Sequence, residues 1–259
     1  MPTLFTPYVC LDGARLGGWL IDLGVVSALC RPQEARLTWT TMELKPAKVA
    51  ATLVLVGPVN PVMFHPEWFK HNELLKAAEA DAAELQVLSP NITMFKNDWL
   101  EVDIRPERIQ LRTQQEPYFP VLRDLGLGIL RCMPRVPIPQ LGFNWENYYQ
   151  FQNSDDYHSL GHKLAPKEPW GNQMVKPGMV SLIMRSERAD DWKGVKNFTV
   201  RPDLQSATGL EAIVAVNDHV SFDEEKPKTP ARAIECIETY WEQSRLDFDE
   251  VASYLIRGI

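Results

Sequence analysis

Apolar residues recur along this chain with two different periods, and each period predicts a different kind of element. Alternating apolar and polar residues, and short runs rich in β-branched or aromatic residues, predict strands. The run 49–56 is apolar on both faces, which is typical of a central strand with cover on each side. The other predicted strands are 36–44, 91–96, 99–105, 108–114, 143–151, 179–188, 196–201 and 209–217.

Apolar residues spaced three and four apart predict helices. The predicted helices are 66–85, 117–133, 155–164 and one that begins after Thr229 and ends near 245. Thr229 is a suitable cap and Pro230 is a favoured first residue, so both mark the start of this helix. Asp247 and Glu250 have the spacing of a capping box, which predicts a separate short helix that ends near Gly258.

The order of the predicted elements repeats along the chain. A strand, a helix, three strands and a helix occupy about 47–133, and a similar series occupies about 138–245. Because tight turns join most of the strands, the sheet is expected to be mostly antiparallel. We predict an α+β fold with two similar halves, 36–133 and 134–259, which can share one continuous sheet. Residues 1–35, which prolines and glycines interrupt, are predicted to form an N-terminal strap or arm.

The strand 143–151 has one strongly aromatic face. It carries Phe143, Trp145, Asn147, Tyr149 and Phe151 at alternate positions. The simpler interpretation is that this face belongs to the core. A surface on which a ligand stacks is the alternative.

Composition narrows the class of protein. The formal charge of −7 argues against a dedicated nucleic-acid binder, whose electrostatic footprint is normally basic. The four cysteines are far apart in the sequence, which excludes a zinc ribbon and favours free thiols over a disulfide framework. No basic stretch precedes the first apolar residues, and no apolar run is long enough to span a bilayer. We therefore expect a soluble, cytoplasmic protein with no membrane association.

The candidate for metal chemistry is the predicted helix 155–164. His158 and His162 are one helical turn apart on the same face, which is ligand spacing for zinc or another divalent cation, and Asp155 adds a carboxylate. Against a metal site, the segment lacks the internal glutamate of H-E-x-x-H, and Gly161 weakens the helix. Two solvated histidines are the simpler interpretation.

Other candidates for chemistry are weaker. His65 is a potential helix cap, and His219 is predicted to lie in a loop after the strand 209–217. Six arginines between 105 and 135 can form an anion-binding patch that nearby acidic residues partly neutralise. The chain has no G-x-G-x-x-G, no P-loop and no G-x-S-x-G motif. We therefore assign no catalytic residue, no cofactor-binding residue and no cofactor other than the divalent metal considered above.

The leading hypothesis is a non-enzymatic binding or assembly subunit that acts through protein–protein contacts. Its expected interface anchors are Trp170, Trp192 and either Tyr240 or Trp241, because aromatic side chains dominate interface energetics. Self-association through an unpaired sheet edge fits the same pattern. The alternative is a metal-dependent hydrolase or nuclease that uses the cluster of Asp155, His158 and His162. A third hypothesis is a small-ligand module with its pocket between the two halves.

Overall fold

The computed structural model describes residues 44–222 and 228–259. The predicted arm 1–35 and all but the last residue of the predicted strand 36–44 lie outside these described residues. Within them, five α-helices and one sheet of nine strands give an α+β fold, as the sequence predicted. The two halves contribute to the same continuous sheet.

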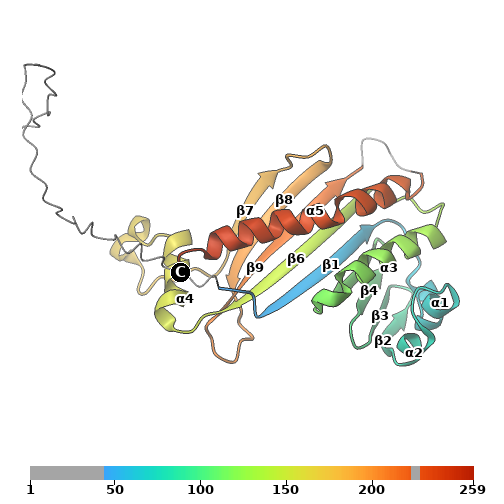
Figure 1. Ribbon diagram of the computed structural model, residues 1–259, viewed down its shortest axis with the longest axis horizontal. Coiled ribbons are helices and arrows are strands. Elements are labelled where there is room, and N and C mark those ends of the chain that lie inside the picture. Colours follow the sequence, from blue (N-terminus) through green and yellow to red (C-terminus); the bar gives the residue numbers. More distant parts are fainter. Residues whose placement is uncertain (1–43, 223–227) are drawn as a thin grey trace, which may run out of the picture. The chain divides into compact units, whose positions relative to one another are not determined.

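Every neighbouring pair of strands in the sheet is antiparallel. The strand order is β2-β3-β4-β5-β1-β6-β9-β8-β7, so β2 and β7 form the two edges (Figure 1). The strands are β1 Lys48–Val56, β2 Glu84–Ser89, β3 Ile92–Lys96, β4 Glu101–Arg105, β5 Arg108–Thr113, β6 Gln140–Gln150, β7 Leu182–Glu187, β8 Lys193–Pro202 and β9 Glu211–Ser221.

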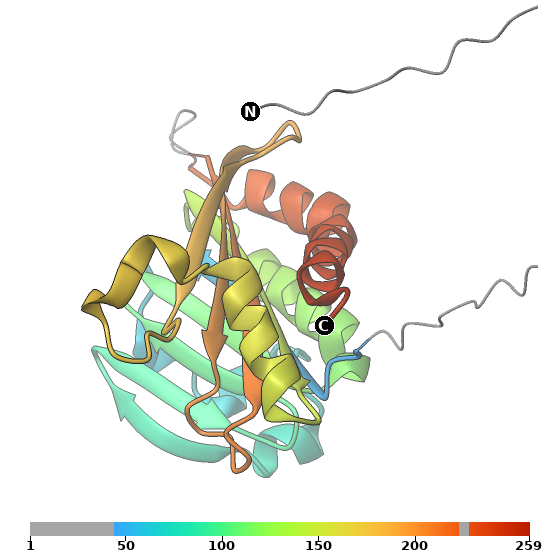
Figure 2. The same ribbon diagram turned by 90° about the vertical axis from the view of Figure 1, so that its left-hand side faces the viewer.

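Two of the helices cover one face of the sheet. The helices are α1 Pro66–His71, α2 Ala77–Asp81, α3 Phe119–Cys132, α4 Ser154–Leu164 and α5 Ala231–Ile256. Figure 2 shows α3 and α5 side by side on the same side of the sheet, where α3 packs on β1 and β5 and α5 packs on β6 and β9. None of the helices in the described residues combines the length and the apolar character needed to cross a membrane.

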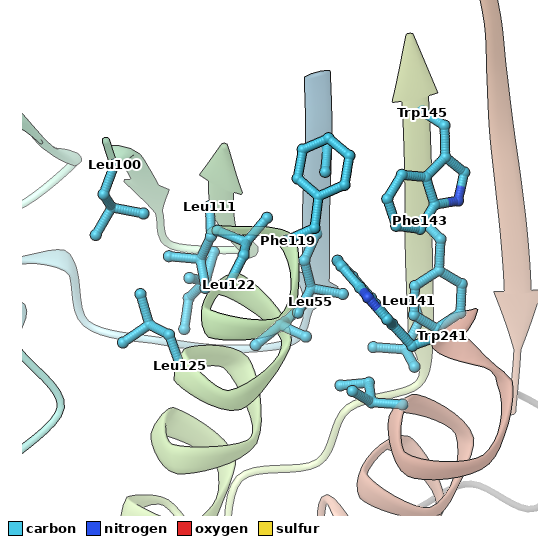
Figure 3. Packing of buried hydrophobic residues seen from close by; sticks show 14 of the residues in the cluster. Leu55, Leu100, Leu111, Phe119, Leu122, Leu125, Leu141, Phe143, Trp145 and Trp241 are labelled. Atoms are coloured by element: carbon cyan, nitrogen blue, oxygen red, sulfur yellow. The ribbon is translucent and has the colours of Figure 1, made fainter. Parts of the chain in front are cut away.

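The aromatic face of β6 belongs to the core, as the sequence predicted. Phe143, Trp145 and Tyr149 are buried, and the rings of Trp145 and Trp241 meet edge to face with their centres 4.8 Å apart. Figure 3 shows these rings between the sheet, α3 and α5. Because α3 approaches β1 closely, its Gly126 lies directly against the side chain of Leu53.

The opposite face of the sheet is largely polar, although Ile183 also lies on it. One row of directly paired residues crosses all nine strands on this face, and every member is polar. The row is Glu84, Lys96, Glu101, Arg112, Thr52, Asn144, Asn217, Asn197 and Arg185. An antiparallel sheet with one face on the core and one toward water gives this alternation.

The predicted helix 66–85 is wrong. The chain forms two short helices instead, because α1 ends at His71 and Glu73 adopts a left-handed backbone conformation with φ of 59°. The Asn72 side chain donates a hydrogen bond to the carbonyl oxygen of Trp68 and so closes the end of α1. From Glu84 the chain forms β2, an edge strand that the sequence analysis missed.

Two further predictions near the C-terminus are corrected. The helix after Thr229 does not end near 245, because α5 continues without a break to Ile256. Asp247 caps no helix there, since its carboxylate accepts hydrogen bonds from Lys196 and Gln243. The last strand is also longer than predicted, so His219 lies within β9 and not in a loop.

Candidate functional site

The predicted metal ligands lie on the surface of α4. Asp155, His158 and His162 are all exposed, and the ring of His158 contacts that of Tyr157 at 5.4 Å between centres. In residues 44–222 and 228–259, no group of three or more histidine, cysteine, aspartate or glutamate side chains is arranged to hold a metal ion. The metal site therefore stays a prediction from spacing, and the geometry adds no support to it.

The predicted arginine patch is largely neutralised. Arg112 forms an ion pair with Glu146 at 2.9 Å, and Arg123 pairs with Asp124 at 2.8 Å. The pairs of Arg105 with Asp103 and of Arg131 with Glu238 follow the same pattern. His65 caps α1, as predicted, because its Nδ1 accepts a hydrogen bond from the backbone N–H of Glu67.

The predicted interface anchors lie in three different environments. Trp170 is 56% exposed, so it remains available to a partner. Trp192 is half-buried, with its ring against Phe222 and the Arg232 guanidinium 4.9 Å from the ring centre, so it joins the β7–β8 loop to the start of α5. The prediction for Trp241 is wrong, because this residue is 2% exposed and packs on Trp145; its neighbour Tyr240 is 4% exposed.

Exposed apolar side chains gather along β7 and the segment that leads into it. We call this set the β7 surface; its members are Trp170, Met174, Val175, Val180, Ile183 and Met184. Ile183 and Met184 are 64% and 61% exposed although they are consecutive and point to opposite faces of the sheet. Both faces of this strand are therefore open to a partner.

The outer edge of β7 is unpaired within the described residues. β7 pairs with β8 on one side, and no described strand pairs with it on the other. An unpaired edge presents backbone N–H and C=O groups that can accept another strand. Its sequence, from Leu182 to Glu187, contains no proline and no bulge, two of the devices that block such pairing, and its charged residues are Arg185 and Glu187.

A buried ionic cluster fixes the end of β7 to the rest of the molecule. Arg188, the first residue after β7, has a side chain that is 2% exposed, and it forms ion pairs with Asp218 of β9 and with Asp190. The guanidinium also lies 4.7 Å from the ring centre of Tyr240 on α5. Burial alone would lower the pKa of Arg188, but the bonds to Asp190 and the charge of Asp218 outweigh it and raise this pKa.

Asp218 is the centre of this cluster. Its carboxylate is 1% exposed and accepts hydrogen bonds from the hydroxyl groups of Ser244 at 2.6 Å and of Tyr240 at 3.0 Å. Ser244 in turn accepts a hydrogen bond from the indole N–H of Trp145 at 3.0 Å. Burial, and then the charge of Asp218, raise the pKa of Tyr240, so its hydroxyl group stays protonated and can donate.

A second ion pair ties β8 to α5 beside this cluster. Lys196 donates to Asp247 at 2.6 Å, and its ammonium group lies 3.9 Å from Asp218. Burial would raise the pKa of Asp247, yet the hydrogen bonds from Lys196 and Gln243 outweigh it and lower this pKa. The β7–β8 hairpin is therefore anchored from both of its strands.

Sequence reasoning missed Arg188, Asp218 and Ser244. One signal was present: Asp218 shares the strand phase of Val214 and Val216, which are apolar. A charged residue at an apolar position of a strand predicts a buried charge with a partner. The identity of that partner depends on the fold, because Arg188 is far from Asp218 in the sequence.

The ion pairs described above hold the β7–β8 hairpin in place, and the unpaired edge of β7 is a place where an extended segment of another chain can add as a strand. Comparison of the chain with protein-family models and with curated proteins finds no match.

Proposed function

We propose that the protein is a binding subunit that takes up an extended segment of a partner protein along β7. One observation carries the proposal: β7 is an unpaired edge strand, within the described residues, with exposed apolar side chains on both faces. In strand addition, backbone hydrogen bonds supply affinity and alternate side chains supply specificity. Ile183 and Met184 would contact alternate side chains of the added strand.

The sheet has a second edge strand, β2, and it is less suited to strand addition than β7. β2 also has exposed apolar residues, Leu85, Val87 and Leu88, but each is less exposed than Ile183 or Met184. Its pairing with β3 is interrupted by a register shift between Leu85 and Val87. A bulge twists an edge away from a new strand. β7 is therefore the better docking edge.

A partner protein fits β7 better than a second copy of this chain. The two symmetric antiparallel pairs nearest the centre of β7 set Met184 or Arg185 opposite its own copy, and they place Ile183 opposite Arg185 or Glu187, respectively. Apolar side chains would then lie opposite charged ones, which gives little cross-strand stabilisation. A partner segment with apolar residues at these positions avoids the mismatch.

The test uses peptides selected against the intact chain from a random peptide library. We expect extended peptides with alternating apolar residues, and we expect them to lose binding to an Ile183→Lys, Met184→Lys variant. The matched control is Val87→Lys, Leu88→Lys on β2, which should bind like the wild type. Hydrogen exchange should show new protection of β7 amides on binding. Peptides that bind the β7 variant unchanged, or that need the β2 residues, would overturn the proposal.

Native mass spectrometry separates the partner from self-association. We expect the purified wild-type chain to be a monomer, because the symmetric pairs nearest the centre of β7 set Ile183 opposite a charged residue. A dimer that the Ile183→Lys, Met184→Lys substitutions dissolve would assign the β7 edge to a second copy instead.

A further inference from the structure

A cavity of about 200 Å³ lies where α4 packs near the adjoining ends of β8 and β9. It is separate from the exposed side chains of the β7 surface. Its wall includes His158 and Leu160 of α4, Lys167 and Met179 of the connection to β7, and Arg201 of β8.

The polar part of this wall is basic. Lys167 and Arg201 are cationic and His158 supplies ring nitrogens, while no aspartate or glutamate is among the lining residues. This is unusual in a chain whose formal charge is −7. The cavity therefore has a charge opposite to that of the molecule as a whole.

Neither cation has a partner among the residues that the structure describes. Within the described residues, Lys167 and Arg201 are half-buried and form no hydrogen bond or ion pair through their side chains. A partly buried cation is normally paired, because removal from water without compensation is costly. An anion in the cavity would supply the missing partner, and a guanidinium group suits a carboxylate or phosphate through two parallel hydrogen bonds.

The rest of the wall is apolar. Leu160 and Ala212 are each 2% exposed, and Tyr157 and Met179 pack against the core. The Tyr157 ring is held edge to face by Phe151, with 5.7 Å between the ring centres. Known pockets for larger ligands occupy roughly 300–1,000 Å³, so this one suits a small molecule. The ligand should combine one anionic group with a compact apolar body.

We propose that this cavity is a binding site for a small organic anion, with Lys167 and Arg201 as its charge-recognition residues and the Leu160–Met179 side as its apolar wall. His158 is the third polar group, a role that needs neither His162 nor a metal. The site is independent of strand addition at β7.

Isothermal titration calorimetry with three probes tests the proposal. Phenyl phosphate and benzoate carry the anion on an apolar ring, and benzamide keeps the ring without the charge. We expect saturable binding of at least one anion at up to millimolar concentration and none of benzamide. Which anion binds more tightly distinguishes a phosphate site from a carboxylate site. Binding should weaken as salt is added, because the attraction is between charges.

Variants that remove the charge of Lys167 or Arg201 test whether these two residues bind the anion. Lys167→Gln and Arg201→Gln should each weaken binding of the anion by about tenfold, since a hydrogen bond to a charged group is worth that much. Arg135→Gln makes the same change at an exposed site outside the cavity and should bind like the wild type. Circular dichroism of each variant shows that it is folded.

Three outcomes would overturn the proposal. They are no anion binding at millimolar concentration, equal binding of benzamide, and unchanged affinity in both cavity variants. If the cavity variants prove unfolded, salt dependence and the benzamide comparison on the wild-type chain still decide the matter.

Discussion

The helix-covered face of the sheet has two parts, one under α3 and one under α5, and different contacts hold each helix on the sheet. Under α3 the contacts are apolar. Leu122 and Leu125 are buried there (Figure 3). Ile129 is buried too, and Gly126 lets the helix approach Leu53. Under α5, the apolar packing around Trp241 continues into an ionic cluster centred on Asp218. The same layer architecture thus depends on close packing on one side and on paired charges on the other.

The contacts under α3 and those under α5 differ because the two helices pack on different parts of the sheet. The strands beneath α3 are β1 and β5, and β5 is the last strand of a meander of tight hairpins, β2 to β5. The β7–β8 hairpin is the outermost part of the other side, and much of β7 is exposed. Apolar cover is sparse there, so directed bonds from Arg188 and Lys196 provide the attachment. Three changes test this comparison.

The largest effect is expected from Asp218→Ala. The substitution leaves Arg188 buried with one of its two carboxylate partners removed. It also leaves the Ser244 hydroxyl group without its acceptor, and Tyr240 with its longer bond to Asp247 at 3.3 Å. Breaking a buried ion pair in this way costs about 3–5 kcal/mol of unfolding free energy. Urea unfolding measures the loss. Asp124→Ala breaks the exposed pair with Arg123 and should cost less than about 1 kcal/mol; equal losses would mean that burial does not distinguish the two pairs.

A smaller effect is expected from Gly126→Ala under α3. The added methyl group would collide with the Leu53 side chain, and overpacking costs about 1–3 kcal/mol, which the better helix propensity of alanine offsets by about 1 kcal/mol. Gly161→Ala on α4 is the control, because no atom lies within 4 Å of the added methyl group. Thermal denaturation should show that the control is stabilised and Gly126→Ala destabilised. Stabilisation of both variants would contradict close packing under α3.

The smallest effect is the acid sensitivity of the α5 side. The pKa of Asp190 and that of Asp247 are lowered in the folded chain, by hydrogen bonds that outweigh the opposing effect of burial. Their contribution is therefore present above the ordinary aspartate pKa of about 4 and is lost as pH falls below it. Both groups are partly exposed, so we expect less than about 1 kcal/mol from each.

Urea unfolding at a series of pH values checks this contribution. Asp247→Asn should lose less stability than the wild type when the pH falls below about 4, because one titrating group is gone. Asp124→Asn, at an exposed site, serves as the control. A wild-type and an Asp247→Asn chain with the same pH dependence would rule out Asp247 as a source of acid sensitivity.

The sequence predicted the strands that have a regular alternation. In β5, Ile109, Leu111 and Thr113 are buried and their neighbours are not, so the period of two was visible. β2 was not predicted as a strand, because its apolar residues lie on an exposed edge and continue the helical spacing of the preceding segment. The break between α1 and α2 depends on the left-handed backbone of Glu73. The sequence gives no sign of it, because the residue is not a glycine.

Less of the candidate site was visible in the sequence. Trp170, predicted as an interface anchor, is exposed, but Trp241 was not recognised as core, because a tryptophan on a helix has the same local signature in either place. The edge position of β7 depends on the order of strands in the sheet, which alternation does not encode. The pairing of Arg188 with Asp218 needs both that order and the placement of α5.

The central place of β1 has a consequence for biosynthesis. β1 precedes both of its partners in the chain, since Leu53 pairs with Leu111 of β5 and with Phe143 of β6. During translation β1 emerges as an apolar strand whose two edges cannot be satisfied until those later strands leave the ribosome. Such long-range pairing is slow and exposes strand edges to aggregation. Nascent chains that stop before β6 are therefore expected to need a chaperone to remain dispersed.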